Sequence, residues 1–483
     1  MDRLNSILFI VGLSLSKVAI FLLIPSAYAF ISETQGAIEF LATSMLSSVL
    51  AFLLMRPGTK INLDFKTRDI FLITLIIWIF DCVFSALPFY FILHCSYTNA
   101  FFETMSGLTT FGGTVFTDLD SLPHSILLWR SMLQWIGGVG FVVIAVAILP
   151  KLNVGGMKLF QSENSEKNKE TPKTTTLAKN IIIVYLIATF CCFSCYMFCG
   201  MGVFDSICHA FTTVATGGFS THNASMSAFS NDAQWVCIIF MVIGSLPFML
   251  FAKCAKRKSL SYLVTNQQVT GYLKFILFTG CILSFYLFLK NNFSLSDSIR
   301  VGFFNIISVI TTSGYALGDW SSWGALPSMI LLFILPLGGC TGGTSGGIKY
   351  FRIQIISILF KRQCKELLHP LAIIPQTYNG HQINDSIIRS VVAFFLSYVF
   401  VLMASSLLIA IDNIDIMVAI TSSMSAISNV GPAYGSPEVI SATYDQLPTL
   451  TKWILSADML CGRLEILTVM VLLLPRIWNL TEK

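Results

Sequence analysis

Long apolar runs recur along the whole chain, with short polar segments between them. Each run is close to the length of about 20 residues that a helix needs to cross the hydrocarbon core of a bilayer. The runs occupy residues 6–31, 36–55, 69–93, 124–150, 178–200, 233–252, 271–290, 325–360, 386–411 and 449–475. The pattern therefore predicts an all-α membrane protein with ten spans. Arg3 precedes the first run, but no convincing cleavage site follows, so we expect a retained first helix rather than a signal peptide.

Composition supports the same class of protein. Of the 483 residues, 55% are hydrophobic and 11% are charged, whereas a soluble domain has roughly 25% charged residues. A soluble globular protein is therefore excluded. The net charge of +5 is spread along the chain without a basic patch, so no nucleic-acid partner is expected.

The thirteen cysteines include a cluster that superficially resembles the ligands of an iron–sulfur centre. Its members are Cys191, Cys192, Cys195 and Cys199. All four lie inside an apolar run, where cysteine behaves as a small hydrophobic residue and a thiolate would be costly. No cysteine and histidine motifs have zinc spacing. We expect no cofactor bound by this chain.

Lysine and arginine are distributed unevenly between the connecting segments, and short cytoplasmic loops are usually the basic ones. Segments 56–68, 151–179, 253–258 and 349–365 are basic, whereas 94–123, 201–231 and 412–451 contain no lysine or arginine. With both termini in the cytoplasm, ten spans place the basic segments inside and the others outside. Segment 291–324 is the exception, because it is expected outside and holds Arg300.

The outer segments begin with apolar stretches that are too long for simple loops, and each is predicted to enter the membrane and turn back. Non-helical backbone at that depth is tolerated only where it is buried in protein or lines a watery cavity. A four-residue motif recurs at the four turns, with its last glycines separated by 105 (217 − 112), 97 (314 − 217) and 117 (431 − 314) residues. The motifs are Thr109, Thr110, Phe111, Gly112; Val214, Ala215, Thr216, Gly217; Thr311, Thr312, Ser313, Gly314; and Ser428, Asn429, Val430, Gly431. This spacing predicts four internal repeats of helix, pore loop and helix.

The residue types in these motifs suit a monovalent cation. Glycine allows positive φ, so successive carbonyls can be aimed at one axis, and rings of carbonyls replace the hydration shell of such an ion. The C-terminal ends of the preceding short helices would favour a cation. The alternative is that threonine and glycine only help helices to pack. Four occurrences, each between two spans on the lysine-poor side, favour the filter.

A glycine-rich stretch, GGCTGGTSGG at 338–347, interrupts the eighth run. Glycine costs about 1 kcal/mol relative to alanine in a helix, so the stretch is predicted to be a loop within the membrane. It is not a phosphate-binding loop, because Gly347 is followed by Ile348 before Lys349. Its polar residues Thr341, Thr344 and Ser345 are candidates for lining an ion path.

Arg463 lies in the last run, and an intramembrane charge is by default a functional candidate. We expect it to act as an electrostatic barrier to a cation rather than as a structural ion pair. Glu465 lies on another helix face and is expected to pair elsewhere. Lys17, Asp81, Arg130 and Asp458 receive no role.

Several motifs together make the whole chain resemble the Trk/Ktr/HKT superfamily of potassium transporters, in particular its TrkH and TrkG type. The motifs are FFETMSGLTTFGGT at 101–114, LQWIGGVGFVVIAVAILP at 133–150, HAFTTVATGGFSTHNAS at 209–225, GGCTGGTSGGIKYFR at 338–352, SNVGPAYG at 428–435 and GRLEILT at 462–468. The chain departs from the family pattern at Phe111 and Gly113, where threonine and alanine are expected, and at Asp458 and Cys461 in a usually apolar stretch.

The resemblance implies four tandem helix/pore-loop/helix repeats around a central pore, preceded by two extra transmembrane helices. The expected divisions are a two-helix extension at 1–66 and repeats at 67–155, 156–262, 263–368 and 369–483. Gly112, Gly217, Gly314 and Gly431 would be the filter glycines, with the preceding residues supplying further carbonyls. The implied gate below the filter comprises Gly338, Gly339, Thr341, Gly342, Gly343, Thr344, Ser345, Gly346, Gly347 and Arg463.

The implied function is potassium uptake across the bacterial inner membrane through a gated, channel-like pore in each subunit of a homodimer. A secondary transporter that couples potassium to H⁺ or Na⁺ is the alternative. A membrane-embedded enzyme is not expected, because His209 and His222 lie thirteen residues apart (222 − 209) without a matching acidic or thiol partner.

A cytoplasmic partner is also implied. The loops contain no strand–glycine–helix unit that could bind a dinucleotide, whereas the family pairs with a ring of RCK-type subunits that bind NAD(H) or adenine nucleotides. Segments 151–179, 253–258 and 349–365 are the expected docking surface.

Overall fold

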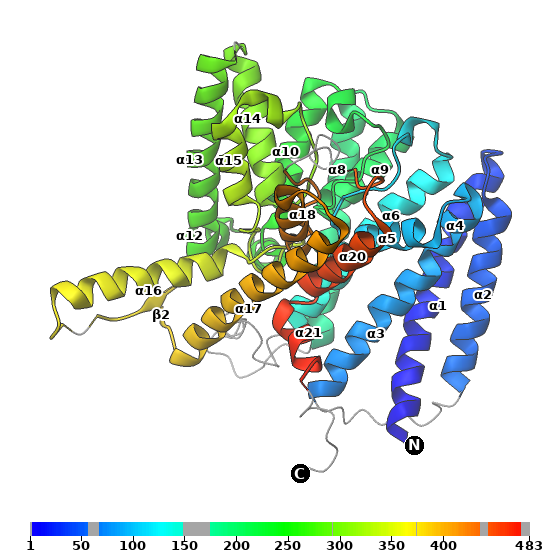
Figure 1. Cartoon of the computed structure of the whole chain (residues 1–483), viewed down its shortest axis with the longest axis horizontal. Helices are drawn as coiled ribbons and strands as arrows, with labels where there is room; N and C mark the ends of the chain where they lie inside the picture. Colours follow the sequence, from blue (N-terminus) through cyan, green and yellow to red (C-terminus); the bar gives the residue numbers. More distant parts are fainter. Residues whose placement is uncertain are drawn as a thin grey trace.

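The computed structural model describes residues 2–56, 67–147, 174–291, 293–372, 374–434 and 443–474, almost all of them helical or in short turns between helices (Figure 1). The helices before the glycine-rich stretch are α1 (Asp2–Ile31), α2 (Ala37–Met55), α3 (Thr67–Ser85), α4 (Leu87–Leu93), α5 (Tyr97–Leu108), α6 (His124–Ala147), α8 (Thr174–Phe198), α9 (Val203–Val214), α10 (Asn231–Ser245), α11 (Phe248–Arg257), α12 (Ser261–Thr265), α13 (Gln267–Lys290), α14 (Leu295–Ile310) and α15 (Ala325–Ile334). After it follow α16 (Tyr350–Leu368), the antiparallel strands β1 (Thr377–Tyr378) and β2 (His381–Gln382), α17 (Asp385–Ile409), α18 (Ile416–Ser428), α20 (Thr449–Arg463) and α21 (Ile466–Leu472). Four 3₁₀ turns, η2 (Leu119–Ser121), η5 (Ser225–Ala228), η6 (Trp320–Trp323) and η7 (Ala410–Asp412), lie in the connections.

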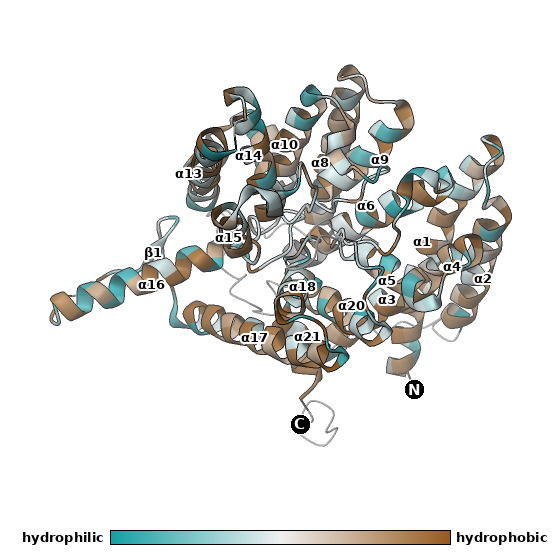
Figure 2. Ribbon diagram, turned by 45° about the horizontal axis from the view of Figure 1, so that its top comes forward, coloured by the Kyte–Doolittle hydropathy of each residue, from teal (hydrophilic) through white to brown (hydrophobic). Residues whose placement is uncertain are grey.

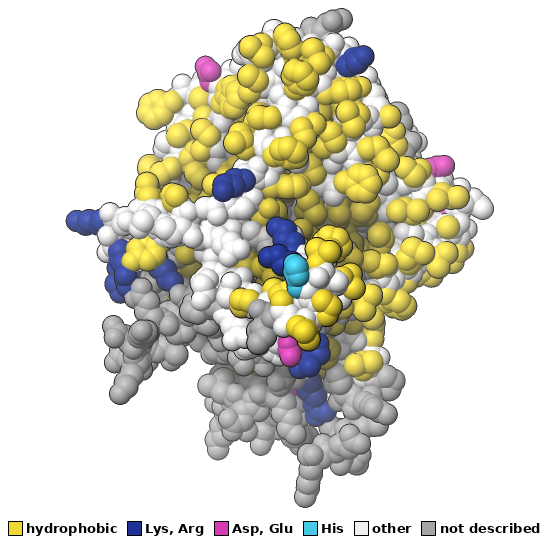
Figure 3. All heavy atoms as spheres, turned by 90° about the vertical axis from the view of Figure 1, so that its left-hand side faces the viewer, with side chains coloured by type: hydrophobic (Ala, Val, Ile, Leu, Met, Phe, Trp, Pro, Cys, Tyr) yellow, Lys and Arg dark blue, Asp and Glu magenta, His cyan; other side chains and the backbone are white. Residues whose placement is uncertain are grey.

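Within the described residues, seven helical segments are long and apolar enough to cross a membrane, and a bent pair makes an eighth. Their outward faces carry large apolar side chains, and the ribbon of α15 and α17 is strongly hydrophobic (Figure 2). Hydrophobic side chains also predominate in the upper part of the face shown in Figure 3, where charged ones are few. A soluble protein would not expose such a surface, so the chain is a multi-pass membrane protein.

Three of the ten predicted spans are not straight helices. An interruption was predicted only for the run 325–360, so the breaks in the other two runs correct the prediction. The run 233–252 bends by 92° between α10 and α11, because Pro247 cannot continue a helix and holds Leu246 in an extended conformation. The run 325–360 is divided by the glycine-rich loop between α15 and α16, as expected. The last run breaks at Glu465, where φ is 65°.

The helices α1 and α2 pack against each other, and α1 packs against α3, at one edge of the molecule (Figure 1). The rest contains four helices of 12 to 16 residues that each end at a glycine-containing turn: α5, α9, α14 and α18. Side chains cap three of them: Ser96 accepts from the Asn99 N–H, and Ser294 and Asp415 do the same for α14 and α18. A turn after each short helix leads on to α6, α10, α15 and α20, respectively.

Several predictions lie partly outside the described residues. These include the division between the first two repeats near 155 and most of the basic segments 56–68 and 151–179. The divisions into repeats, and the side of the membrane that each end faces, stay predictions.

Glycines bring the short helices into close contact with the longer ones. A Cβ on Gly137 of α6 would lie 1.8 Å from the carbonyl oxygen of Leu108, the last residue of α5. A Cβ on Gly462 of α20 would lie 1.8 Å from the oxygen of Ile427 in α18, and one on Gly244 would lie 2.8 Å from that of Val214 in α9. The longer helices therefore support the ends of these three short helices at the backbone itself.

This contact predicts opposite results for two substitutions in one helix. Gly137→Ala places a methyl group against the backbone of Leu108. The substitution should destabilise the protein by about 1–3 kcal/mol, which is the usual cost of overpacking. Gly140→Ala is the matched control, because nothing lies within 4 Å of the added atom. Thermal unfolding of both purified variants in detergent measures the difference, and equal midpoints would show that the close approach is not required.

Candidate functional site

The four short helices end in the same backbone geometry. In each turn one residue in the left-handed region is followed two positions later by a glycine with positive φ. The pairs are Thr110 and Gly112, Thr216 and Gly218, Thr312 and Gly314, and Asn429 and Gly431. The residue between them donates its N–H to the carbonyl oxygen five positions back. The distance from nitrogen to oxygen is 2.9 Å for Phe111, Gly217 and Ser313 and 3.1 Å for Val430. This is the bond that closes a Schellman-type helix end.

The geometry corrects the register of the second motif by one residue. Gly218, with φ of 81°, occupies the place of Gly112, whereas Gly217 occupies the place of Phe111. The second quartet therefore runs from Ala215 to Gly218 rather than from Val214 to Gly217. Two adjacent glycines made the sequence ambiguous at this point. In the other three turns this place is occupied by the last glycine of the quartet: Gly112, Gly314 and Gly431.

The four turns meet in a closed ring. A Cβ on Gly112 would lie 2.3 Å from the carbonyl oxygen of Gly217 in the next loop. In the same way, a Cβ on Gly218 would lie 1.9 Å from the carbonyl oxygen of Ser313, and one on Gly314 would lie 2.0 Å from that of Val430. A Cβ on Gly431 would lie 2.8 Å from the carbonyl oxygen of Phe111, which closes the ring. Only glycine permits this approach at every contact. Four equivalent carbonyl oxygens, which we call the ring carbonyls, are thereby brought together: those of Phe111, Gly217, Ser313 and Val430.

Buried polar contacts hold the loops that leave the ring. The Arg130 Nε of α6 lies 2.7 Å from Oε1 of Glu103 on α5, and both side chains are buried. Glu103 also accepts from the N–H of Val115 at 2.9 Å, and Arg130 donates to the carbonyl of Ser220 at 3.0 Å. This ion pair therefore joins the first loop to the second. Arg130 had received no role from the sequence, because its partner is 27 residues away (130 − 103).

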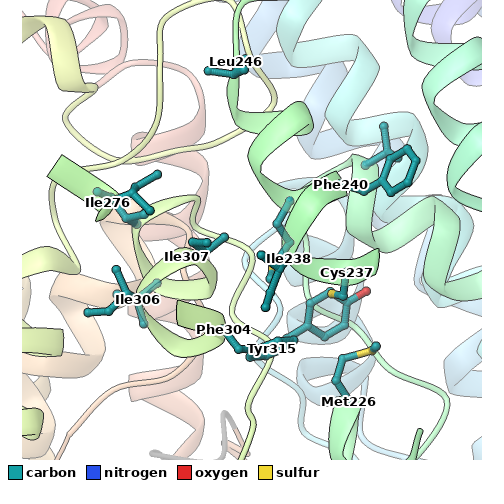
Figure 4. Packing of buried hydrophobic residues seen from close by; sticks show 14 of the residues in the cluster. Met226, Cys237, Ile238, Phe240, Leu246, Ile276, Phe304, Ile306, Ile307 and Tyr315 are labelled. Carbon is teal, nitrogen blue, oxygen red and sulfur yellow. The ribbon is translucent and has the colours of Figure 1, made fainter. Parts of the chain in front are cut away.

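The third and fourth loops are held by tyrosine hydroxyls. Tyr315 in the third loop lies 2.5 Å from the hydroxyl of Thr212 on α9 and is packed beside Cys237 (Figure 4). Tyr444 donates to the carbonyl of Gly431, and its N–H bonds the oxygen of Thr114 at 2.7 Å. Neither tyrosine carries a sequence signal that separates it from a core residue.

A cavity of about 350 Å³ lies on the side of the ring where the loops leave it. Gly112, Gly218 and Gly314 of the ring line it, together with polar residues of the lysine-poor segments. At its rim His222 lies 2.5 Å from Asp120, and this hydrogen bond lowers the pKa of that carboxyl group. His209, the second histidine considered in the sequence, contacts the Asp205 carbonyl and the Ser220 hydroxyl. Both histidines therefore make hydrogen bonds to residues in the segments that follow the turns.

The glycine-rich loop lies against the opposite side of the ring, where the short helices end. Thr344 donates to the carbonyl of Val214 at 3.0 Å and contacts the hydroxyl of Thr216 at 3.1 Å. The Gly346 N–H bonds the Thr312 hydroxyl at 2.7 Å, and a Cβ on Gly346 would lie 2.4 Å from the Ser428 oxygen. The loop thus contacts the second, third and fourth turns. Every residue from Gly338 to Gly346 is buried.

Arg463 lies against this loop. Its guanidinium donates to the carbonyl of Thr344 at 2.8 Å and to that of Gly137 at 3.3 Å, and it lies 4.2 Å from the ring centroid of Phe141. In the described part of the chain no carboxylate is within ion-pair distance of it. Glu465 pairs instead with Arg352 at 2.7 Å, so it pairs elsewhere as predicted. The reason differs from the prediction, because Glu465 lies at the break between α20 and α21 and not on another face of a continuous helix.

The side chain of Gln134 on α6 was not selected from the sequence, yet its amide contacts the ring. Its Nε2 lies 2.7 Å from the Gly217 oxygen.

Asp458, also left without a role, accepts hydrogen bonds from the hydroxyl of Ser405 at 2.5 Å and from that of Ser423 at 3.0 Å. Among the described residues no group of three or more His, Cys, Asp or Glu side chains could hold a metal ion.

The fold and the ring define a multi-pass helical membrane protein built around four converging loops. A family model for TrkH, described as a cation transport protein, matches residues 35–293 and 291–479. The chain belongs to the TrkH family. This confirms the resemblance that the sequence motifs indicated.

Individual relatives are similar over nearly their whole length. The Trk system potassium uptake protein TrkI of Halomonas elongata is 34% identical, and the alignment covers 95% of this chain and 94% of the relative. TrkH of Escherichia coli K12 is also 34% identical, with 97% and 98% covered. The crystal structure of the potassium transporter TrkH from Vibrio parahaemolyticus superposes with a TM-score of 0.91 at 31% identity, covering 98% of this chain and 99% of that one. The predicted all-α membrane fold is therefore confirmed.

The Glu103–Arg130 pair predicts a large cost for one conservative change. Glu103→Gln leaves a buried guanidinium without its counter-charge, which should destabilise the protein by about 3 kcal/mol. The double variant Glu103→Gln with Arg130→Met should cost less than the sum of the single changes. Thermal unfolding in detergent measures all three variants.

A partly exposed pair provides the control. Glu366→Gln breaks the pair of Arg362 and Glu366 on α16, and such a pair is worth about 1 kcal/mol or less. If Glu103→Gln shifts the unfolding midpoint no more than Glu366→Gln does, the buried pair does not hold the loops together.

Proposed function

We propose that this chain takes up potassium across the bacterial inner membrane as the membrane component of a Trk system, with the ion passing through the ring of four loops. The closed ring of four equivalent carbonyls carries the proposal. Relatives that cover almost the whole chain are named as potassium uptake proteins, which supports the choice of ion.

The chemistry of the ring favours a monovalent cation of low charge density. Carbonyl oxygens replace the hydration shell of the ion without the fixed negative charge that would hold a divalent cation. The four short helices end at the ring, and the partial negative charge of their C-termini opposes an anion. Arg130 lines the cavity but is paired with Glu103, and segments 94–123 and 201–231 around it contain no lysine or arginine.

The glycine-rich loop acts as the gate in this proposal. It lies directly under three of the four turns, so an ion that has passed the ring meets backbone and the guanidinium of Arg463. Conduction then requires the loop to move. Its positive-φ residues Gly338, Gly342 and Gly347 allow a second backbone arrangement that side chains would restrict.

Two partners complete the proposal. The chain functions as a homodimer in which each subunit has its own pore, and a cytoplasmic ring of RCK-type subunits moves the gate. Lys256, Arg257 and Lys258 at the end of α11 are exposed and offer a basic docking surface. Because α11 follows the bend after Ser245, whose oxygen accepts from the Cys340 N–H at 3.0 Å, this surface is mechanically connected to the gate.

Substitutions in the ring test the filter. Gly112→Ser, Gly218→Ser and Gly431→Ser each push a side chain into the neighbouring loop and should weaken the discrimination of potassium from sodium by roughly tenfold or more, about 1.4 kcal/mol. Permeability ratios of purified protein in liposomes measure the effect. Gly140→Ser, on open surface, should match the parent.

Parent selectivity in all three ring variants would refute the filter assignment. Potassium flux in fixed stoichiometry with H⁺ or Na⁺ would instead identify a coupled carrier.

A second experiment tests the gate. Arg463→Ala and deletion of residues 342–345 should each raise potassium flux in the absence of the cytoplasmic partner. A unit charge about 6 Å from the ion at an effective dielectric near 20 contributes roughly 3 kcal/mol, enough for more than a tenfold change. The two effects should not add, because both changes act on one barrier.

The single and double variants are compared in the same liposome flux assay. If the deletion opens the path while Arg463→Ala leaves flux at the parent level, Arg463 only supports the loop.

A further inference from the structure

The side chain of Gln134 makes two hydrogen bonds to the second loop. Its Nε2 donates to the carbonyl oxygen of Gly217 at 2.7 Å, and its Oε1 accepts from the N–H of Phe219 at 3.1 Å. The side chain is fully buried. One amide on α6 therefore holds the backbone of the second loop on both sides of Gly218.

This contact distinguishes one ring carbonyl from the other three. The ring carbonyls of Phe111, Ser313 and Val430 occupy equivalent places, since each lies against a glycine of the adjacent loop. No side-chain donor of the described chain bonds any of these three oxygens. The ring is thus fourfold in its backbone but not in its hydrogen bonding.

The amide also explains why the second loop differs in sequence. Phenylalanine, serine and valine occupy the equivalent positions of the other loops, whereas the second loop has Gly217. A Cβ on Gly217 would lie 2.3 Å from Oε1 and 2.4 Å from Cδ of Gln134. Glycine is required here because the amide fills the space of a side chain. The backbone at Gly217 has no positive φ that would provide another reason.

We propose that Gln134 is a specificity-determining residue that weakens and immobilises one ring carbonyl and so favours potassium over sodium. An oxygen that already accepts an N–H bond has less electron density for an ion and cannot swing inward freely. Sodium needs stronger or closer ligands than potassium, because its hydration shell is harder to replace. Both effects of the amide therefore disfavour sodium. The inference rests on the proposed passage of potassium through the ring.

Two variants test the role of the amide. Gln134→Met keeps the length of the side chain but removes both hydrogen bonds, and Gly217→Ala displaces the amide while leaving it in the chain. One hydrogen bond to a carbonyl has a modest net value, so each change should raise the sodium-to-potassium permeability ratio about threefold to tenfold. The double variant should exceed neither single variant by much, because both changes break the same contact.

The measurement is the sodium-to-potassium permeability ratio of purified full-length protein in liposomes, with size-exclusion profiles to show intact folding. Gln268→Met is the control, since Gln268 is a buried glutamine of α13 and does not line the ring. It should keep the parent ratio. A role limited to packing would lower total flux in the Gln134 and Gly217 variants without moving this ratio.

The possible failures are distinguishable. If the folded variants keep the parent ratio, Gln134 does not determine specificity, whatever happens to total flux. If the parent itself does not conduct potassium, or does not distinguish it from sodium, the proposed function fails first.

Discussion

Backbone that is not helical within a membrane must find hydrogen-bond partners inside the protein or line a path for water and ions, and this constraint shapes the structure. The turns after α5, α9, α14 and α18 close their helix ends with Schellman-type bonds, and the last three of these turns also contact the glycine-rich loop. That loop satisfies its own groups on the turns and on α10, for example through the bond from the Thr344 N–H to the Gly244 oxygen at 2.9 Å. Three ring carbonyls receive no side-chain donor from the described residues.

The buried side chains of Arg130, Arg352 and Arg463 differ in their partners. Two ion pairs have a distance of 2.7 Å between nitrogen and oxygen: Glu103 with Arg130, and Arg352 with Glu465. The first joins α5 to α6, and the second joins α16 to the break between α20 and α21. Arg463 is different, because its guanidinium contacts carbonyls and an aromatic ring rather than a carboxylate. A charge without a carboxylate partner is costly to bury, and in the proposed function its position under the ring is what opposes a passing cation.

Two residues at which the sequence departs from the pattern that the resemblance implies, Phe111 and Asp458, are accommodated by their surroundings. Phe111 stands where the family pattern has threonine, and its ring packs 5.5 Å from that of Tyr444, whose hydroxyl bonds Gly431. The bulky side chain thus braces the first and fourth loops from outside the ring instead of entering it. Asp458 is accommodated in the last span by two serine hydroxyls from α17 and α18.

The sequence by itself determined the class of protein, the four turns and the glycine-rich loop, because apolar length and runs of glycine act locally. It did not determine the register of the second turn, since Gly217 and Gly218 differ only through their partners: the Gln134 amide, 83 residues away (217 − 134), and the Ser313 carbonyl. The partners of Arg130 and Arg463 were likewise decided by tertiary structure. Each depends on packing between helices far apart in the chain, which periodicity and composition do not encode.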